Sequence, residues 1–316
     1  MSIPEATDST RRPPRLRPGA RVAIVAPSSA PPEPSMLARG LRALERLELE
    51  PVLAPGVDEI DGYLAGSDRR RADDLLWALS DDAIDAGWCA RGGYGAQRTV
   101  AALDLDAFDA LRDREPKALV GFSDITVLHA LISARLGWVS FYGPVVTSLG
   151  RASAYTLAGV RAALMTGEPF TVAPNPDDDF VSTLHAGQAT GPLAGGCLSL
   201  LAAVAGTPLQ VDFAGRIAFF EDVHEEPYRI DGRLSQLLAA GCFDGCAGIA
   251  IGEHVDTGPD GGLERVFADL LGPLEVPCCF YLPIGHGNHL ATLPIGAQAQ
   301  LDADHGVLRV AEPGVR

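Results

Sequence analysis

Short apolar runs alternate with amphipathic segments along the first half of the chain. The apolar runs are rich in Val, Ile and Ala and predict β-strands, and the segments between them have the residue spacing of helices. Strands are expected at 21–26, 52–54, 84–90, 118–122 and 139–142, and helices at 36–47, 68–79, 97–103 and 125–135. Because strands that alternate with helices form right-handed crossovers, this half is predicted to be an α/β domain with a mostly parallel sheet flanked by helices.

The pattern changes after about residue 150. A Pro- and Asp-rich stretch at 174–179 is typical of an exposed connection, and beyond it strands and helices are expected in a mixed order. The last part of the chain alternates between apolar and polar residues over short segments, which indicates antiparallel strands. We therefore predict an N-terminal domain at 19–150, a connection at 151–179, and a C-terminal mixed α/β domain rich in β-strands at 180–316.

Composition supports two domains and excludes several classes of partner. A chain of 316 residues is long enough for about two domains. It has 25 Lys and Arg against 41 Asp and Glu, a formal net charge of −16, which would repel nucleic acids and anionic membrane surfaces. We therefore expect neither nucleic acid nor a membrane as a partner.

The remaining composition points to a reducing compartment. The segment before residue 19 has no apolar stretch of the kind found in secretory signals, and no later run approaches the roughly 18 apolar residues of a membrane span. The six cysteines form no paired framework. Cys242 and Cys246 have no second pair at zinc-site spacing, so we interpret them as small buried residues. A cytoplasmic location is predicted.

Two candidate sites follow strands of the N-terminal half, at the strand ends where ligands of parallel sheets bind. The first, Arg91-Gly92-Gly93-Tyr94-Gly95, has glycines whose amide N–H groups can face an anion, and a tight turn before a helix is its less favoured alternative. The second is Gly121-Phe122-Ser123-Asp124. It resembles a nucleophile elbow without the second glycine, and its alternative interpretation is a simple helix cap.

Two further candidates follow strands of the C-terminal half. In the segment FFEDVHEEPY, Glu221 could orient a catalytic imidazole, whereas acidic clusters of this kind are more often solvated surface. In Gly285-His286-Gly287-Asn288-His289, a histidine between glycines has little local packing to explain it, which favours a functional role. Metal binding by His286 and His289, with help from Glu253-His254, is the less favoured alternative because the pair lacks the helical framing of zinc motifs.

Taken together, these segments resemble the LD-carboxypeptidase family, which includes muramoyl-tetrapeptide carboxypeptidases and microcin-immunity peptidases. The resemblance runs in order through VAIVAPSS, ARGGYGAQR, LVGFSDIT, GPLAGGCLSLL, FFEDVHEEPYRIDGRLSQLL and LPIGHGNHLATLPIGAQAQLD. Each motif alone is weak, but the ordered set covers most of residues 21–302. The resemblance implies a serine peptidase with a Ser-Glu-His triad that needs no metal or organic cofactor.

Carried over by position, the resemblance implies roles for particular residues. The catalytic triad is Ser123, Glu221 and His286, and the oxyanion hole is formed by the amides of Gly93 and Asp124. We assign Gly92, Tyr94 and Arg91 to substrate binding, since an exopeptidase must bind a free carboxylate and arginine is its natural partner. Arg98 flanks the same glycine turn and is a second candidate for the carboxylate.

The resemblance also implies a substrate: a muropeptide tetrapeptide, from which the enzyme removes the terminal D-alanine at an L,D-peptide bond during cell-wall recycling. Hydrolysis of an aminoacyl-nucleotide analogue is the alternative within the family, and it calls for aromatic stacking on a base. The three tryptophans, Trp77, Trp88 and Trp138, all lie in the N-terminal half. A non-catalytic α/β module that binds an anion is a third hypothesis, and a homodimer is expected.

Overall fold

The computed structural model describes residues 10–174, 181–257 and 262–316, and it contains two sheets. The first has the strand order β12-β5-β4-β3-β1-β2. Its parallel strands are β1 (Arg21–Val25), β2 (Glu50–Leu53), β3 (Ala86–Cys89), β4 (Ala118–Gly121) and β5 (Ser140–Tyr142). Strands β3, β4 and β5 are buried along their whole length, as expected for parallel strands covered on both faces.

Helices cover both faces of this first sheet and build two apolar cores. One face is covered by α2 (Asp68–Ser80), α3 (Ala96–Ala102), α4 (Leu105–Asp109) and α5 (Thr126–Leu136). The other face is covered by α1 (Pro34–Arg46), α6 (Val146–Leu149) and α7 (Ala154–Arg161). Two short 3₁₀ helices, η1 (Ala110–Asp113) and η2 (Ser123–Ile125), and a π-helical turn, η3 (Ala162–Thr166), complete this half. The predicted mostly parallel sheet flanked by helices is confirmed.

The second sheet has the order β6-β14-β13-β8-β9-β10-β11-β7. Four adjacent strands run parallel: β8 (Gln188–Cys197), β9 (Ile217–Val223), β10 (Gly248–Val255) and β11 (Cys278–Leu282). The antiparallel outer strands are β6 (Phe170–Val172), β7 (Ser182–His185), β13 (Gln298–Asp302) and β14 (Val307–Val310). One face is covered by α8 (Leu198–Val204), α9 (Pro227–Ala239) and α10 (Gly262–Leu271), which η4 (Gly272–Leu274) follows. This is the predicted mixed α/β half rich in strands.

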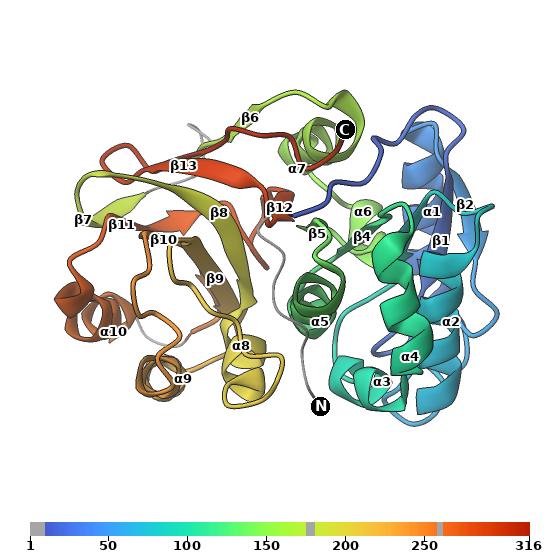
Figure 1. Ribbon diagram of the computed structural model, residues 1–316, viewed down its shortest axis with the longest axis horizontal. Helices are drawn as coiled ribbons and strands as arrows, with labels where there is room; N and C mark the ends of the chain where they lie inside the picture. Colours follow the sequence, from blue (N-terminus) through green and yellow to red (C-terminus); the bar gives the residue numbers. More distant parts are fainter. Residues whose placement is uncertain (1–9, 175–180, 258–261) are drawn as a thin grey trace.

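Two strands cross the boundaries expected from the sequence. Strand β12 (Leu293–Ile295) belongs to the range 180–316, but it pairs antiparallel with β5 of the first sheet. Strand β6 belongs to the range 151–179, expected as a connection, but it pairs with β14 of the second sheet. Residues 175–180, which include most of the Pro- and Asp-rich stretch, lie outside the described residues. Figure 1 shows β12 between the two halves, so the chain returns to the first domain near its end.

The two halves share an apolar core. It joins Tyr142 of β5 and Leu293 of β12 to residues of the second sheet such as Phe219, whose ring lies 5.4 Å from that of Tyr142. This shared core holds the carboxyl ends of β4 and β5 against β9, where three of the four candidate segments meet. The fold therefore places candidate residues from both halves at one domain boundary.

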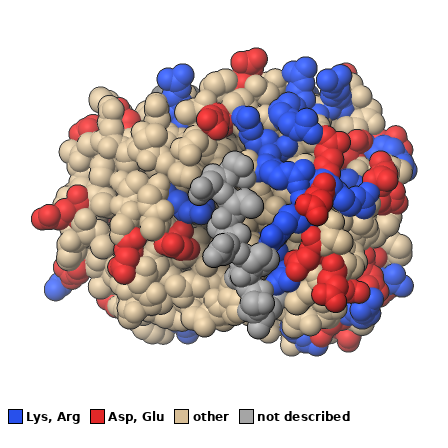
Figure 2. All heavy atoms as spheres, viewed as in Figure 1, with Lys and Arg blue, Asp and Glu red and all other residues tan. Residues whose placement is uncertain are grey.

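Charge is unevenly distributed on the surface. On the face shown in Figure 2, basic and acidic side chains are concentrated over the N-terminal half, while the C-terminal half shows mostly uncharged atoms. Ion pairs such as Arg69 with Asp73 and Arg98 with Asp68 lie in this N-terminal half. Within the described residues, every helix is too short or too polar to cross a bilayer.

Candidate active site

Ser123 lies immediately beyond the carboxyl end of β4, at the first position of η2. Its φ angle is +64°, a left-handed conformation that costs a residue with a side chain about 1–2 kcal/mol. Strained backbone of this kind persists where the surrounding structure holds it, and it is concentrated at functional sites. The sharp turn predicted from GFSD is therefore present, and it leaves the Ser123 side chain half-buried at the domain boundary.

The glycine turn after β3 packs directly against this serine. A Cβ atom placed on Gly92 would lie 3.2 Å from the Cβ of Ser123 and 3.5 Å from the backbone nitrogen of Asp124. Gly93 and Gly95 have φ angles of +99° and +134°, which residues with a side chain rarely adopt. Two candidate segments about 30 residues apart are thus brought into contact because their strands are neighbours in the sheet.

Ser29, which the sequence analysis did not single out, holds the glycine turn in place. Its backbone N–H donates to the carbonyl of Gly92 at 3.3 Å, and its Oγ accepts from the backbone N–H of Tyr94 at 3.1 Å. A Cβ on Gly93 would approach that Oγ to 2.6 Å. The sequence feature that could have identified Ser29 is its place in Pro27-Ser28-Ser29, just after the first strand. The carboxyl end of this strand lies on the same side of the sheet as the glycine turn.

The side chain of Asp124 points into the protein and not into the site. Its Oδ2 accepts from Oγ of Ser28 at 2.7 Å and from the backbone N–H of Ala96 at 2.8 Å, so it joins the turn after β1, the start of α3 and the Ser123 turn. Burial raises the pKa of this carboxyl, and the two hydrogen bonds oppose the shift. What Asp124 can offer a ligand is therefore its backbone N–H.

Replacing Asp124 by alanine is expected to lower the free energy of unfolding by about 1–3 kcal/mol, because two buried donors lose their acceptor. Denaturant titration measures the effect. Asp73→Ala is the matched control, since its ion pair with Arg69 is exposed and contributes little. Equal stability of the Asp124 variant and the wild type would show that this carboxyl does not anchor the turn.

Glu221 and His286 form a direct pair. Nδ1 of His286 lies 2.7 Å from Oε2 of Glu221, and the backbone N–H of His286 donates to the same oxygen at 3.2 Å. Glu221 is fully buried at the carboxyl end of β9, whereas the His286 side chain is 20% exposed. Gly285 makes the approach possible, because a Cβ there would lie 2.2 Å from Oε2 of Glu221.

The pair favours the protonated form of His286. Burial on its own would lower the pKa of this imidazole, but the hydrogen bond and charge of Glu221, assisted by the charge of Asp222, outweigh burial and raise it. With Nδ1 bonded to the carboxylate, Nε2 is the nitrogen left to accept a proton from elsewhere. The arrangement is that of a base with its orienting carboxylate.

Phe122 and Tyr142 connect this pair to the serine turn. The ring of Phe122, the residue before Ser123, lies 4.8 Å from the ring of His286. The hydroxyl of Tyr142 accepts from the backbone N–H of Ser123 at 3.3 Å and donates to Oε1 of Glu221 at 2.5 Å. Sequence reasoning placed Tyr142 on a strand and missed this contact, since its partner is 79 residues away.

The other acidic and histidine candidates lie elsewhere. Glu225 accepts from Arg233 at 2.6 Å, and His289 contacts Oγ of Ser153 through Nδ1 at 2.9 Å. The His224 side chain is 74% exposed. In the part of the chain that the structure describes, no three His, Cys, Asp or Glu side chains are grouped as metal ligands, and all six cysteines are buried free thiols.

The residues assigned to substrate binding belong to the glycine turn itself. Tyr94 is half-exposed and packs edge-to-face with Tyr63, the ring centroids 5.6 Å apart. Arg91 donates to the carbonyl of Ala30 at 3.0 Å. Arg98 is paired with Asp68 at 2.9 Å, so it is already engaged by a carboxylate.

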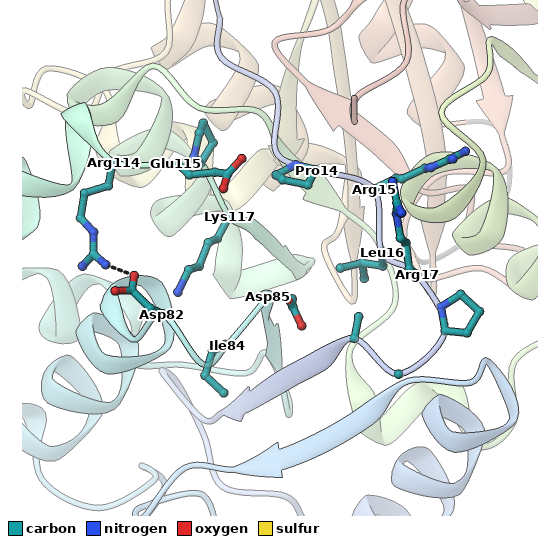
Figure 3. A pocket seen from close by; sticks show the side chains of 14 residues that line it. Pro14, Arg15, Leu16, Arg17, Asp82, Ile84, Asp85, Arg114, Glu115 and Lys117 are labelled. Atoms are coloured by element: carbon teal, nitrogen blue, oxygen red, sulfur yellow. Dashed lines mark hydrogen bonds and ion pairs between the residues drawn. The ribbon is translucent and has the colours of Figure 1, made fainter.

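A cavity of about 570 Å³ lies at the amino ends of the strands of the first sheet, on the side opposite to Ser123. It is lined by residues that precede β1, β3 and β4, among them Ala20, Asp85 and Lys117, and by the segment Pro14–Gly19. Figure 3 shows Arg114 paired with Asp82 at its margin. Because ligands of parallel sheets bind at the carboxyl ends of the strands, this cavity is distinct from the candidate active site.

The chain matches the two domains of one peptidase family. Residues 22–143 match the LD-carboxypeptidase N-terminal domain and residues 190–301 the LD-carboxypeptidase C-terminal domain. A putative carboxypeptidase of Streptomyces coelicolor is 43% identical over 310 residues, covering 96% of this chain and 97% of the relative. A murein tetrapeptide carboxypeptidase of Pseudomonas aeruginosa is 35% identical over 292 residues, covering 90% and 94%.

Solved structures have the same fold. Muramoyltetrapeptide carboxypeptidase from Oxalobacter formigenes superposes with a TM-score of 0.79 at 29% identity, covering 93% of this chain and 99% of that one. MccF in complex with glutamyl sulfamoyl guanosine superposes with a TM-score of 0.86 at 22% identity, covering 96% and 99%, and this likeness concerns the fold alone. From both domain matches and the full-length relatives, the chain belongs to the LD-carboxypeptidase family of serine-type peptidases.

Proposed function

We propose that the protein is a serine carboxypeptidase that hydrolyses the terminal L,D-peptide bond of a muropeptide tetrapeptide and releases D-alanine. The observation that carries this proposal is the Glu221–His286 pair, held against the strained Ser123 turn at the domain boundary. Relatives named as murein or muramoyl tetrapeptide carboxypeptidases support the substrate class.

In the proposed mechanism, Nε2 of His286 accepts the hydroxyl proton as Oγ of Ser123 attacks the carbonyl carbon before D-alanine. Glu221 holds the imidazole through Nδ1 and stabilises the imidazolium. His286 then donates the proton to the leaving amine as the C–N bond breaks, which leaves an acyl-enzyme. Water, deprotonated by the same imidazole, hydrolyses the ester and regenerates the serine.

The oxyanion of each tetrahedral intermediate needs preorganised donors. We assign the backbone N–H groups of Asp124 and Gly93 to this role, since the Gly92–Gly93 turn packs on Ser123 and the Asp124 side chain is occupied elsewhere. Gly92 and Tyr94 would line the substrate site. Arg91, half-buried beside Gly93, is the proposed partner of the substrate's free carboxylate.

Substrate stereochemistry tests the proposal. Purified protein is incubated with a tetrapeptide ending in D-alanine and with its diastereomer ending in L-alanine, and release of alanine is followed by chromatography. We expect cleavage of the L,D bond only, and full activity after exhaustive chelation. No cleavage of either peptide, or loss of activity that zinc restores, would overturn the proposal.

An aminoacyl sulfamoyl nucleotide is the second substrate class to assay. The exposed pair of Tyr63 and Tyr94 beside the glycine turn offers aromatic surface for a base, whereas Trp88 and Trp138 are fully buried and cannot stack on a ligand. Faster hydrolysis of this compound than of the tetrapeptide would favour the microcin-immunity activity. Absence of both activities would favour the non-catalytic anion-binding module.

The homodimer and the cytoplasmic location stay predictions. Sedimentation velocity across a range of protein concentrations measures the first, and cell fractionation the second. A monomer at all concentrations would contradict the expected assembly without affecting the proposed chemistry.

A further inference from the structure

Tyr142 has an unusual position for a buried tyrosine. It ends β5, between Gly121 of β4 and Leu293 of β12, and its side chain is fully buried among aromatic rings. One hydroxyl group makes both of its hydrogen bonds to candidate catalytic residues. It accepts from the backbone N–H of Ser123 at 3.3 Å and donates to Oε1 of Glu221 at 2.5 Å.

We propose that Tyr142 is a positioning residue that holds the orienting carboxylate and the nucleophile turn in register across the domain boundary. The inference rests on the proposed function and extends it. Ser123 and Tyr142 come from the first sheet, and Glu221 from the second. Docking of the two domains thus completes a continuous path from the serine amide, through the tyrosine hydroxyl and the carboxylate, to the imidazole of His286.

The numbers of donors and acceptors on each group fix the direction of the hydrogen bonds in this path. An ionised carboxylate only accepts, so the hydroxyl proton of Tyr142 must point at Glu221, and the backbone N–H of Ser123 must bond to the remaining lone pairs. Burial, reinforced by the charge of Glu221, raises the pKa of the Tyr142 hydroxyl well above its usual range. Tyr142 therefore stays a donor throughout the working pH range.

The carboxylate needs this donor. Glu221 is fully buried, with Oε2 committed to His286 and Oε1 to Tyr142. Without the hydroxyl, Oε1 would lose a charge-assisted hydrogen bond in a fully buried position. The Ser123 amide, held at φ +64°, would lose the partner that helps to fix that conformation.

Other titratable groups lie close to Tyr142 or to its partner Glu221. Cys197 at the end of β8 stays neutral because burial raises the pKa of its thiol, and His129 of α5 stays neutral because burial lowers its pKa to about 4. Asp222, next to Glu221, contributes charge to His286 and is bonded to Ser199. Neither Cys197 nor His129 therefore adds a charge beside the Tyr142 hydroxyl near neutral pH.

Tyr142→Phe tests the proposal. Removing the hydroxyl is expected to lower kcat about 10- to 100-fold with little change in KM, the loss expected for one hydrogen bond to a charged group. A carboxylate without this donor is more basic and stabilises the imidazolium more strongly. The acid limb of the kcat/KM profile is therefore expected to move to higher pH.

Tyr155→Phe is the matched control, since it removes a tyrosine hydroxyl that bonds to the carbonyl of Ala173 outside the site. It should leave kcat and the pH profile unchanged. A wild-type kcat and an unshifted acid limb for Tyr142→Phe would overturn the positioning role. If Ser123→Ala, assayed in parallel, kept its activity, the proposed mechanism itself would fail, which distinguishes the two outcomes.

A second substitution keeps the test decisive if the phenylalanine variant does not fold. Fluorotyrosine incorporated at position 142 keeps the ring and the hydroxyl but makes the hydroxyl a stronger donor. The carboxylate then becomes less basic, and the acid limb should move to lower pH. A limb that stays in place in a folded fluorotyrosine protein would contradict the proposal.

Discussion

Ser123→Ala is expected to reduce kcat/KM for the L,D tetrapeptide by roughly 10⁴- to 10⁶-fold, the loss seen when a serine nucleophile is removed. Without Oγ no acyl-enzyme forms, and the oxyanion donors and bound substrate account for whatever rate remains. Alanine keeps a Cβ in the same backbone conformation, so the melting temperature should be close to that of the wild type. Steady-state kinetics and thermal melting measure the two effects.

A serine-directed fluorophosphonate provides an independent readout of the same substitution. The wild type should form one adduct, located at Ser123 by mass spectrometry of the digested protein, and the variant should form none. Ser148→Ala is the control, since the Oγ of Ser148 bonds to the carbonyl of Val145 within its own helical turn. An adduct or near-normal turnover in Ser123→Ala would exclude this residue as the nucleophile.

Glu221→Gln is expected to lower kcat about 10⁴-fold while the fold is retained, because an amide in this position favours the wrong imidazole tautomer. With the amide oxygen accepting from Tyr142, the amide nitrogen faces Nδ1 of His286 and donates to it, and the backbone N–H of His286 loses its acceptor. The ring proton is then on Nε2, the nitrogen that must accept the serine proton. Glu225→Gln, at a carboxylate paired with Arg233, is the matched control and should have a much smaller effect.

The pH profile provides a second measure of the Glu221 substitution. The raised pKa of His286 means that activity is full at high pH and is lost as pH falls through that value, above the ordinary pKa of about 6.5. Removing the Glu221 charge leaves burial as the main influence, which lowers the pKa. The acid limb should therefore move to lower pH in Glu221→Gln, opposite to the shift for Tyr142→Phe, and an upward shift would contradict the pairing.

Most strands of the N-terminal half could be predicted from the sequence because each is a local apolar run. The runs at 84–90 and 118–122 became the neighbouring strands β3 and β4, so the segments that follow them meet at one edge. Strand β12 could not be assigned in this way. Leu293–Ile295 is a run of only three apolar residues between segments of the second domain, and only the packed structure decides that β5 is its partner.

The candidate site, like the fold, could be predicted from the sequence only in part. By itself, the sequence determined that Ser123, Glu221 and His286 come at or just after the ends of predicted strands, because strand ends and glycine turns are local features of the chain. The tertiary structure decided which groups meet: Nδ1 of His286 on Glu221, Ser29 on the glycine turn, and Tyr142 between serine and carboxylate. Such contacts join residues far apart in the chain, so they depend on how two domains dock and leave no periodicity that a sequence pattern can reveal.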